Sequence, residues 1–424
     1  MTVTPRIRVG YALGSLATGA FATVPGLLLL PFLTDRLAVP AAVAGVLVLV
    51  PKAWDVAFNP IAGRISDRAT HRLGPRRPFL LRGGLALAAL FAVMFLPPLF
   101  GTPLGDGAWV AVSFLACATA FAFFQVPYVA MAAELTDDYH DRTRLIAWRV
   151  AALAIAILLC GAGAPLLRDS GGGYRVMALA VALLIVVGTL GVYIGTATAP
   201  VARVTPTGAR FPELLAAVRS SRPFRLLLLT FVIQAVGIGT LLAGVDYLSR
   251  VVLQDPGAQT LLFAAFVAPA LLVVPVWQVV GRRWGKRVGY QVASVLFAVS
   301  IGLVVFVPAM PVLVGLVGVA GVAYAGLQVF PMAMLPDIIS AEERRAGVVR
   351  AGVFSGVWTA GETAGLALGP GVFGGLLGLG GYVSGGGVQG EGVRVAVVVG
   401  FSVVPAVLVG VTVGLLSFVE GERG

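Results

Sequence analysis

The sequence predicts an all-α integral membrane protein with twelve transmembrane helices in two pseudo-symmetric six-helix halves. Three features support this: the composition, a series of long apolar segments, and an internal repeat. Of 424 residues, 58% are hydrophobic and 12% are charged, whereas a soluble globular chain has about 25% charged residues. This composition excludes a soluble enzyme, and the net charge of +11 is better explained by membrane topology than by nucleic-acid binding.

Twelve apolar segments have roughly the length of about 20 residues that a bilayer requires. Proline or glycine marks the breaks between them, as at Pro40, Pro97, Gly171 and Pro256 and in the glycine-rich stretch 380–392. The first segment is too long for a signal peptide, so we expect it to remain as a spanning helix. We place the segments at 9–34, 40–65, 78–100, 107–132, 147–168, 174–197, 223–249, 257–281, 288–308, 311–335, 350–378 and 393–418.

The basic residues predict the orientation of the chain. An even number of spans puts both termini on one side, and 24 of the 30 basic residues then fall on that side. Five fall on the other side, and Lys52 lies inside a span. Because positive loops stay in the cytoplasm, we expect a plasma (inner) membrane protein with both termini cytoplasmic.

An internal repeat divides the chain into two halves. Gln125, Glu134 and Arg142 each recur 203 positions later, as Gln328, Asp337 and Arg345. We therefore predict an N-terminal six-helix bundle, a cytoplasmic connecting loop and a C-terminal six-helix bundle. Their predicted bounds are 1–198, 199–222 and 223–424.

The second span carries three polar residues within an apolar run. Lys52, Asp55 and Asn59 are three and four positions apart, so a helix places them on one face. A carboxylate inside a membrane helix costs about 2.5–3.5 kcal/mol on insertion scales, so such a residue is a functional candidate. The alternative is a Lys52–Asp55 ion pair that only fixes packing.

A basic turn follows the second span, and charged residues also flank the start of the fifth. They form either ion pairs that gate the protein or ordinary interfacial anchors. The gating candidates are Asp67, Arg68, Glu134, Arg142 and Arg144.

Several motifs carry a family resemblance. The segment from Pro127 to Leu145, PYVAMAAELTDDYHDRTRL, resembles the span 4–5 signature of the glycoside–pentoside–hexuronide:cation symporters. These form the melibiose-carrier-like branch of the major facilitator superfamily. The stretches from Trp54 to Gly63, Met334 to Asp337 and Gly356 to Thr359 resemble motifs of spans 2, 10 and 11. The resemblance runs from about residue 8 to residue 418 and implies the major facilitator fold and cation-coupled transport.

The coupling site departs from the family pattern. Symporters of this family bind the cation with two span 2 carboxylates one turn apart, and here these positions are Asp55 and Asn59. The usual span 4 threonine is matched by Ala122. Since Na⁺ prefers several hard oxygen ligands, we expect H⁺ coupling at Lys52, Asp55 and Asn59. Lys52 argues against this, because a nearby cation favours a permanently charged carboxylate.

The substrate positions also depart from the family. The family places an aspartate in span 1, a second aspartate in span 4 and a stacking tryptophan at positions that are Gly19, Gln125 and Val129 here. The span 5 arginine of the family is kept as Arg149. The usual span 11 lysine is matched by Thr363, which lies beside Glu362. Glu362 either binds protons or a cationic substrate, or is a buried carboxyl group that is hydrogen-bonded across helices. The substrate-site candidates are Gly19, Gln125, Val129, Arg149, Glu362 and Thr363.

The resemblance predicts a secondary transporter, symporter-like, that moves a small organic solute by alternating access with a coupling cation. The alternative is a proton-driven exporter, or a carrier of a lipid-like or other apolar metabolite. The sequence contains no catalytic constellation, metal-ligand cluster or nucleotide-binding loop. We therefore expect no enzyme, no cofactor, no metal and no nucleic-acid partner, and a monomer in the lipid bilayer.

Overall fold

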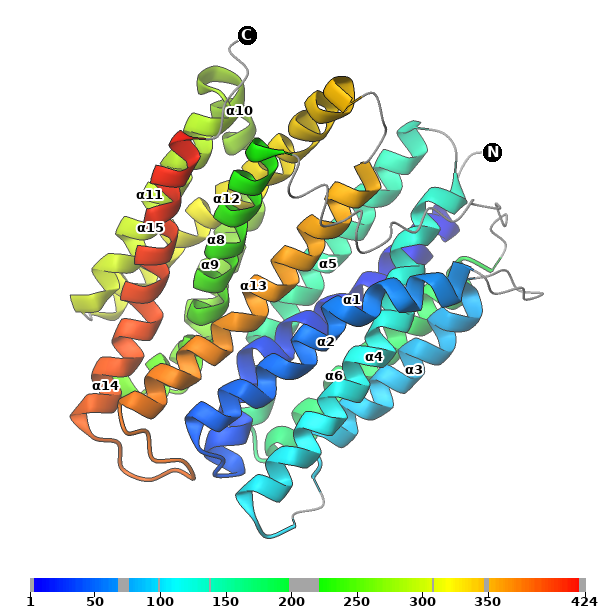
Figure 1. The fold of residues 1–424 in the computed structure, drawn as a ribbon. Coiled ribbons are helices and arrows are strands. Elements are labelled where there is room, and N and C mark those ends of the chain that lie inside the picture. Colours follow the sequence, from blue (N-terminus) through cyan, green and yellow to red (C-terminus); the bar gives the residue numbers. More distant parts are fainter. Residues whose placement is uncertain are drawn as a thin grey trace. The chain divides into compact units, whose positions relative to one another are not determined.

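The computed structural model describes residues 4–67, 76–97, 100–136, 139–197, 221–306, 309–346 and 351–418. Every regular element in this part of the chain is helical (Figure 1). The chain divides into two compact units. Unit 1 comprises residues 1–39, 46–208 and 384–386, and unit 2 comprises residues 40–45, 209–383 and 387–424.

Unit 1 is built from long helices that follow the first six predicted spans. Helix α1 packs along α5 and α6, and α3 packs along α4 and α6. The elements are α1 (Pro5–Pro31), a π-helical turn η1 (Phe32–Arg36), α2 (Ala41–Asp67), α3 (Arg77–Met94), α4 (Pro103–Leu135), α5 (Tyr139–Asp169) and α6 (Gly173–Gly195).

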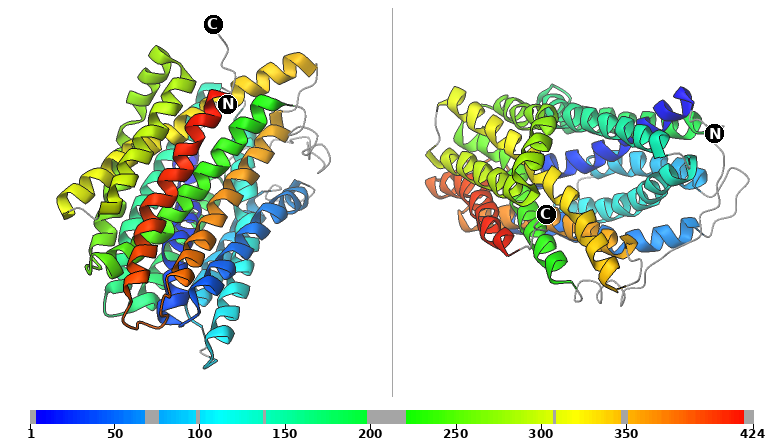
Figure 2. Two further views of the ribbon diagram at one scale, coloured as in Figure 1. Left: turned by 60° about the vertical axis from the view of Figure 1, so that its left-hand side comes forward. Right: turned by 90° about the horizontal axis from the view of Figure 1, so that it is seen from above.

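Unit 2 contains the remaining helices. Helix α8 packs against α13 and α15, and α11 runs beside α12 and α15 (Figure 2). The elements are α8 (Arg222–Tyr247), η2 (Leu248–Val252), α9 (Ala258–Leu272), α10 (Val274–Trp284), α11 (Lys286–Gly302), η3 (Leu303–Phe306), α12 (Met310–Ala346), α13 (Ala351–Leu379), α14 (Glu391–Val398), η4 (Val399–Val403) and α15 (Val404–Ser417).

Local sequence signals set where several helices begin. Thr4, Thr102 and Ser221 are the N-caps of α1, α4 and α8, and each side chain accepts a hydrogen bond from a backbone N–H of the first turn. Each of these helices also has proline at its first or second position, where a missing N–H costs no helical hydrogen bond. These helix starts follow directly from the sequence.

One predicted span is broken. Within the segment 257–281, α9 and α10 meet at Val273 with a bend of 52°. Pro275 stands at the start of α10, where it has no N–H to continue the hydrogen-bond ladder of α9. The interruption that Pro275 predicts for this span, as a bend or as a gate, is therefore present as a bend, and the bent pair lies close to the predicted bounds.

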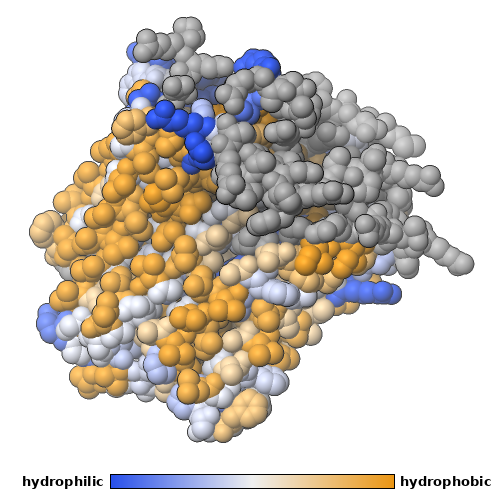
Figure 3. All heavy atoms as spheres, in the orientation of Figure 1, coloured by the Kyte–Doolittle hydropathy of each residue, from blue (hydrophilic) through white to orange (hydrophobic). Residues whose placement is uncertain are grey.

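The described helices are long and apolar enough for a multi-pass membrane protein. Ten of them qualify as candidate spans, or eleven if the bent pair α9–α10 counts as one. Helix α13 is not among these, but its 29 residues occupy the predicted span 350–378. In Figure 3 the described surface is mostly apolar along the helices, with hydrophilic residues nearer their ends. This distribution matches a protein whose helices face lipid.

Candidate functional site

The coupling candidates of unit 1 lie on α2 facing the aromatic side chains of α1 and α4. Asp55 is 7% exposed, and its Oδ1 atom has no hydrogen-bond partner within the described residues. The Oδ1 atom of Asn59 is likewise buried without a hydrogen bond to any described group. This face of α2 therefore carries two buried oxygen atoms, on Asp55 and Asn59, that have no hydrogen-bond partner among the described groups.

Lys52 makes its close contacts with aromatic rings. Its Nζ atom lies 5.5 Å from the ring centroid of Phe21 and 5.8 Å from that of Phe114. Within the described residues, no salt bridge of 4.0 Å or less joins Lys52 to Asp55. A cation over two ring faces is stabilised by their quadrupoles. Lys52 therefore has a stabilising environment that does not use the carboxylate of Asp55.

Helix α4 carries another buried oxygen atom without a hydrogen-bond partner in the described part of the chain, on Gln125, close to the level of Asn59 on α2. The Nε1 atom of Trp54 donates to Thr119 Oγ1 at 3.0 Å, and the Phe58 and Phe123 rings are 5.5 Å apart. These contacts align the turn of Asp55 and Asn59 with the turn before Gln125. The Oε1 atom of Gln125 is buried without a hydrogen-bond partner in the described part of the chain.

Arg149 belongs to a second polar cluster, which joins α1, α4 and α5. Its guanidinium group lies over the ring of Tyr128, 5.3 Å from the ring centroid, and its buried Nε has no hydrogen-bond partner among the described groups. The Tyr128 hydroxyl donates to the carbonyl of Tyr11 at 2.7 Å and lies 2.9 Å from Ser15 Oγ. The tyrosine is thus held rigidly, while one N–H of Arg149 stays available.

The other substrate candidates of unit 1 lie in different surroundings. Gly19 is buried, and a Cβ atom placed on it would lie 2.7 Å from the Cβ of Ala156. Its small size therefore lets α1 approach α5. Val129 is 43% exposed on α4, next to Tyr128. Substrate contact at Gly19 and Val129 remains a prediction.

Unit 2 contains a buried polar cluster around Glu362. A cavity of about 20 Å³ is lined by Glu362 of α13, Tyr324 and Gln328 of α12, and Gln234 of α8. Gln234 Oε1 accepts a hydrogen bond of 2.6 Å from the Tyr290 hydroxyl, and its Nε2 donates to Leu327 O at 3.1 Å. Thr363 is half-buried beside Glu362. The amide side chain of Gln234 thus has a fixed orientation beside this cavity.

The gating candidates can be placed only in part. Arg144 is exposed on α5. Arg68 lies outside the described residues, and so do the side chains of Asp67, Glu134 and Arg142. Past the basic turn, the buried Arg76 donates to Ser66 Oγ at 2.8 Å, which joins α2 to the start of α3.

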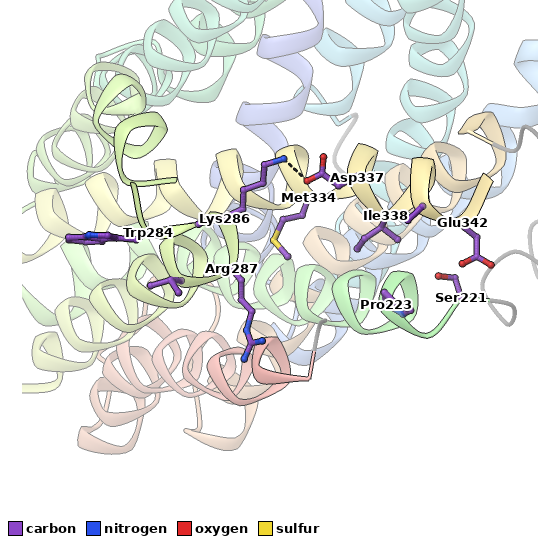
Figure 4. A pocket seen from close by; sticks show the side chains of 12 residues that line it. Ser221, Pro223, Trp284, Lys286, Arg287, Met334, Asp337, Ile338 and Glu342 are labelled. Atoms are coloured by element: carbon purple, nitrogen blue, oxygen red, sulfur yellow. Dashed lines mark hydrogen bonds and ion pairs between the residues drawn. The ribbon is translucent and has the colours of Figure 1, made fainter. Parts of the chain in front are cut away.

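The corresponding turn of unit 2 contains an ion pair that was missed among the candidates. Lys286, at the α10–α11 turn, pairs with Asp337 of α12 and donates to Ala333 O at 3.1 Å (Figure 4). The pair lines a cavity of about 660 Å³ together with Arg287 and Glu342. The 203-residue offset from Glu134 to Asp337 could have identified it.

The described residues contain no group of three His, Cys, Asp or Glu side chains that could hold a metal ion. What they contain instead is unpaired or partly paired polar groups inside apolar helices. Each such group needs a hydrogen bond, a proton or an ion to offset its burial.

Comparison of the sequence with known protein families assigns the chain to one of them. The model of the family described as MFS/sugar transport protein matches residues 10–420. The chain belongs to this family. The match confirms the sequence-based resemblance over almost the full length of the chain.

Individual relatives agree with the family match. A putative glycoside/cation symporter of Escherichia coli, YagG, is 31% identical over 172 residues, which cover 40% of this chain and 37% of that protein. A putative 2,3-dihydroxypropane-1-sulfonate exporter of the same organism is 26% identical over 299 residues, covering 67% of this chain and 63% of the exporter. In the matches to YagG and two uncharacterised symporters, the aligned segment covers 27–37% of the relative's length.

A solved structure confirms the fold. The crystal structure of a bacterial homologue of the human lysosomal transporter Spinster aligns with a TM-score of 0.73 and covers 100% of both chains, at 16% sequence identity. At this identity the likeness concerns the fold alone. The predicted all-helical major facilitator fold is thereby confirmed.

Proposed function

We propose that the protein is a cation-coupled secondary transporter that moves a small organic solute by alternating access. The observation that supports this most directly is the buried carboxyl group of Asp55, whose Oδ1 has no hydrogen-bond partner within the described residues. A carboxyl group in an apolar helix is stabilised when it binds a proton or a cation. Its reversible occupancy can therefore couple an ion gradient to movement.

The proposed coupling ion is H⁺. The buried oxygen one turn from Asp55 that lacks a partner among the described groups belongs to the neutral amide of Asn59, and the position of the family threonine is the buried Ala122. A proton needs one acceptor, whereas Na⁺ needs several oxygen ligands. The contact of Lys52 with Phe21 and Phe114 also supports this proposal, because it leaves the carboxyl group without a direct salt bridge.

The proposed solute is a small polyhydroxylated molecule that carries an anionic group. Arg149 offers a buried N–H without a hydrogen-bond partner in the described part, beside the fixed ring of Tyr128. A guanidinium group pairs well with carboxylate, sulfonate or phosphate oxygens. The names of the relatives, a glycoside symporter and a dihydroxypropane-sulfonate exporter, describe hydroxylated solutes of this size. These polar groups favour such a solute over an apolar metabolite.

The proposed setting is the plasma (inner) membrane, with a monomer whose termini both face the cytoplasm. The basis is the distribution of basic residues, 24 on the side of the termini and five on the other. Gating by the charged residues that flank spans 2 and 5 belongs to the same proposal.

The test uses purified protein in sealed proteoliposomes, with a panel of radiolabelled hydroxylated sulfonates, uronates and glycosides. An imposed pH gradient should drive accumulation of at least one solute in one direction. Asp55→Asn keeps the shape but cannot carry the proton, so gradient-driven accumulation should fall to background while solute exchange persists. Asp106→Asn is the matched control, because Asp106 is buried but accepts a hydrogen bond from Phe100 N outside the site. Accumulation by Asp55→Asn, or driving by Na⁺ alone, would contradict proton coupling.

A further inference from the structure

A third cavity lies at the end of unit 1 opposite the N-terminus. It has a volume of about 600 Å³ and lies between the η1 turn after α1, the end of α3 and the α5–α6 turn. Its lining includes Phe32, Arg36, Phe95, Gly171, Tyr174 and Arg175. None of these residues belongs to the coupling or substrate candidates described above.

The cavity is positively charged. Arg36 and Arg175 are both exposed, and neither forms an ion pair or side-chain hydrogen bond with any described residue. The neighbouring acids do not line the cavity: Asp35 accepts a hydrogen bond of 2.9 Å from Thr34 Oγ1, and Asp169 pairs with Arg168 at 2.9 Å. Two guanidinium groups therefore face the cavity without a compensating carboxylate.

The backbone adds to this positive potential. The 23-residue helix α6 begins at Gly173, so its first N–H groups and its positive dipole end lie at the cavity. A Cβ atom placed on Gly171 would meet no atom within 4 Å, which shows that the space beside this glycine is open. An anionic group can therefore approach the turn closely.

The remaining walls are apolar. The ring of Phe32 lies 4.7 Å from that of Tyr174 and 5.0 Å from that of Phe95, measured between centroids. Leu179, which also lines the cavity, is 57% exposed, and Leu183 is 64% exposed one turn further along α6. An amphiphilic ligand would match both the basic and the apolar parts.

We propose that this cavity binds the headgroup of an anionic phospholipid, with the phosphate between Arg36 and Arg175 and the acyl chains along Leu179 and Leu183 of α6. The cavity lies at the ends of membrane helices, the depth at which headgroups occur. Basic pockets between membrane helices are known to hold acidic headgroups. Only five basic residues are predicted for this side of the membrane, Arg36, Arg168, Arg175, Arg250 and Arg394. Two of the five line this one cavity.

The test measures lipid binding to the full-length protein in neutral detergent, by native mass spectrometry and by thermal unfolding. The probes are dioleoyl phosphatidylglycerol, dioleoyl phosphatidylcholine with the same acyl chains, and inorganic phosphate. The variants are the double change Arg36→Gln with Arg175→Gln, and Gly171→Trp, which adds a large side chain at the cavity wall. Arg394→Gln is the control, because Arg394 is an exposed arginine of unit 2 on the same predicted side of the membrane.

The wild type and Arg394→Gln should bind phosphatidylglycerol more tightly than phosphatidylcholine and should unfold at a higher temperature with it. Both cavity variants should weaken phosphatidylglycerol binding at least roughly tenfold, because one removes both guanidinium groups and the other places a large side chain beside them. Wild-type binding in both variants, or equal binding of the two lipids, would overturn the proposal. Equal stabilisation by inorganic phosphate would identify a soluble-anion site and would also overturn it. None of these outcomes depends on the transport proposal.

Discussion

At the scale of single residues, the structure gives Lys52 close contacts other than the carboxylate one turn away. Lys52 and Asp55 are one helical turn apart, yet Lys52 lies over the rings of Phe21 and Phe114. These rings stabilise the ammonium group of Lys52 without the carboxylate of Asp55. Asp55 keeps an oxygen without a hydrogen bond to described groups, which makes it the better candidate for the coupling residue.

Arg149 gives a prediction at this scale. Arg149→Lys keeps the charge but removes the planar fork that lies over Tyr128, so the solute affinity should fall about tenfold, while Arg149→Ala should lose more. The measurement is concentration-dependent uptake or exchange of the solute identified in proteoliposomes. Arg82→Lys, an exposed arginine of α3, should behave as wild type. Unchanged affinity in Arg149→Ala would remove Arg149 from the substrate site.

At the scale of the helices, glycine decides how closely neighbours pack. A Cβ atom on Gly10 of α1 would overlap the Cα of Gly195 on α6. In unit 2, Gly361, Gly365 and Gly369 of α13 all face α8 at close range, as their small-residue spacing predicts. These contacts bring backbones together where larger side chains would separate them.

A matched pair of substitutions tests this packing. Gly10→Ala should lower the stability of the protein by about 1–3 kcal/mol, because backbone atoms of α6 must shift. Gly163→Ala should be neutral or stabilising by up to about 1 kcal/mol, since a Cβ there meets no atom within 4 Å and alanine favours the helix. Thermal unfolding in detergent compares the two. Equal effects would show that the α1–α6 contact can adjust to a methyl group.

At the scale of the whole molecule, charge distribution predicts the topology. A cysteine at Leu104, which is 65% exposed at the start of α4, should react with a membrane-impermeant maleimide applied from outside the cell. A cysteine at Trp284, 57% exposed at the end of α10, should react only after the membrane is opened. The native Cys117 and Cys160 are buried, so background labelling should be low. The opposite pattern would invert the predicted orientation.

The sequence by itself determined the class, the family and most helix bounds. Membrane insertion depends on the length and polarity of each segment, and helix starts depend on a few adjacent residues such as Thr102 and Pro103. These are local properties, so they can be predicted without knowledge of the fold. The proline at 275 predicts an interruption of the span, but its form, a bend of 52° at Val273, depends on the packing of neighbouring helices.

Only the tertiary structure decided which polar groups meet. Tyr11 and Tyr128 are 117 positions apart and bond to each other's carbonyl groups, and Lys286 pairs with Asp337 across 51 positions. Sequence spacing gives the face of one helix, but not the neighbour that this face contacts or the direction in which a long side chain extends. The partners of Lys52, Arg149 and Lys286 therefore depend on packing between helices that are distant in the chain.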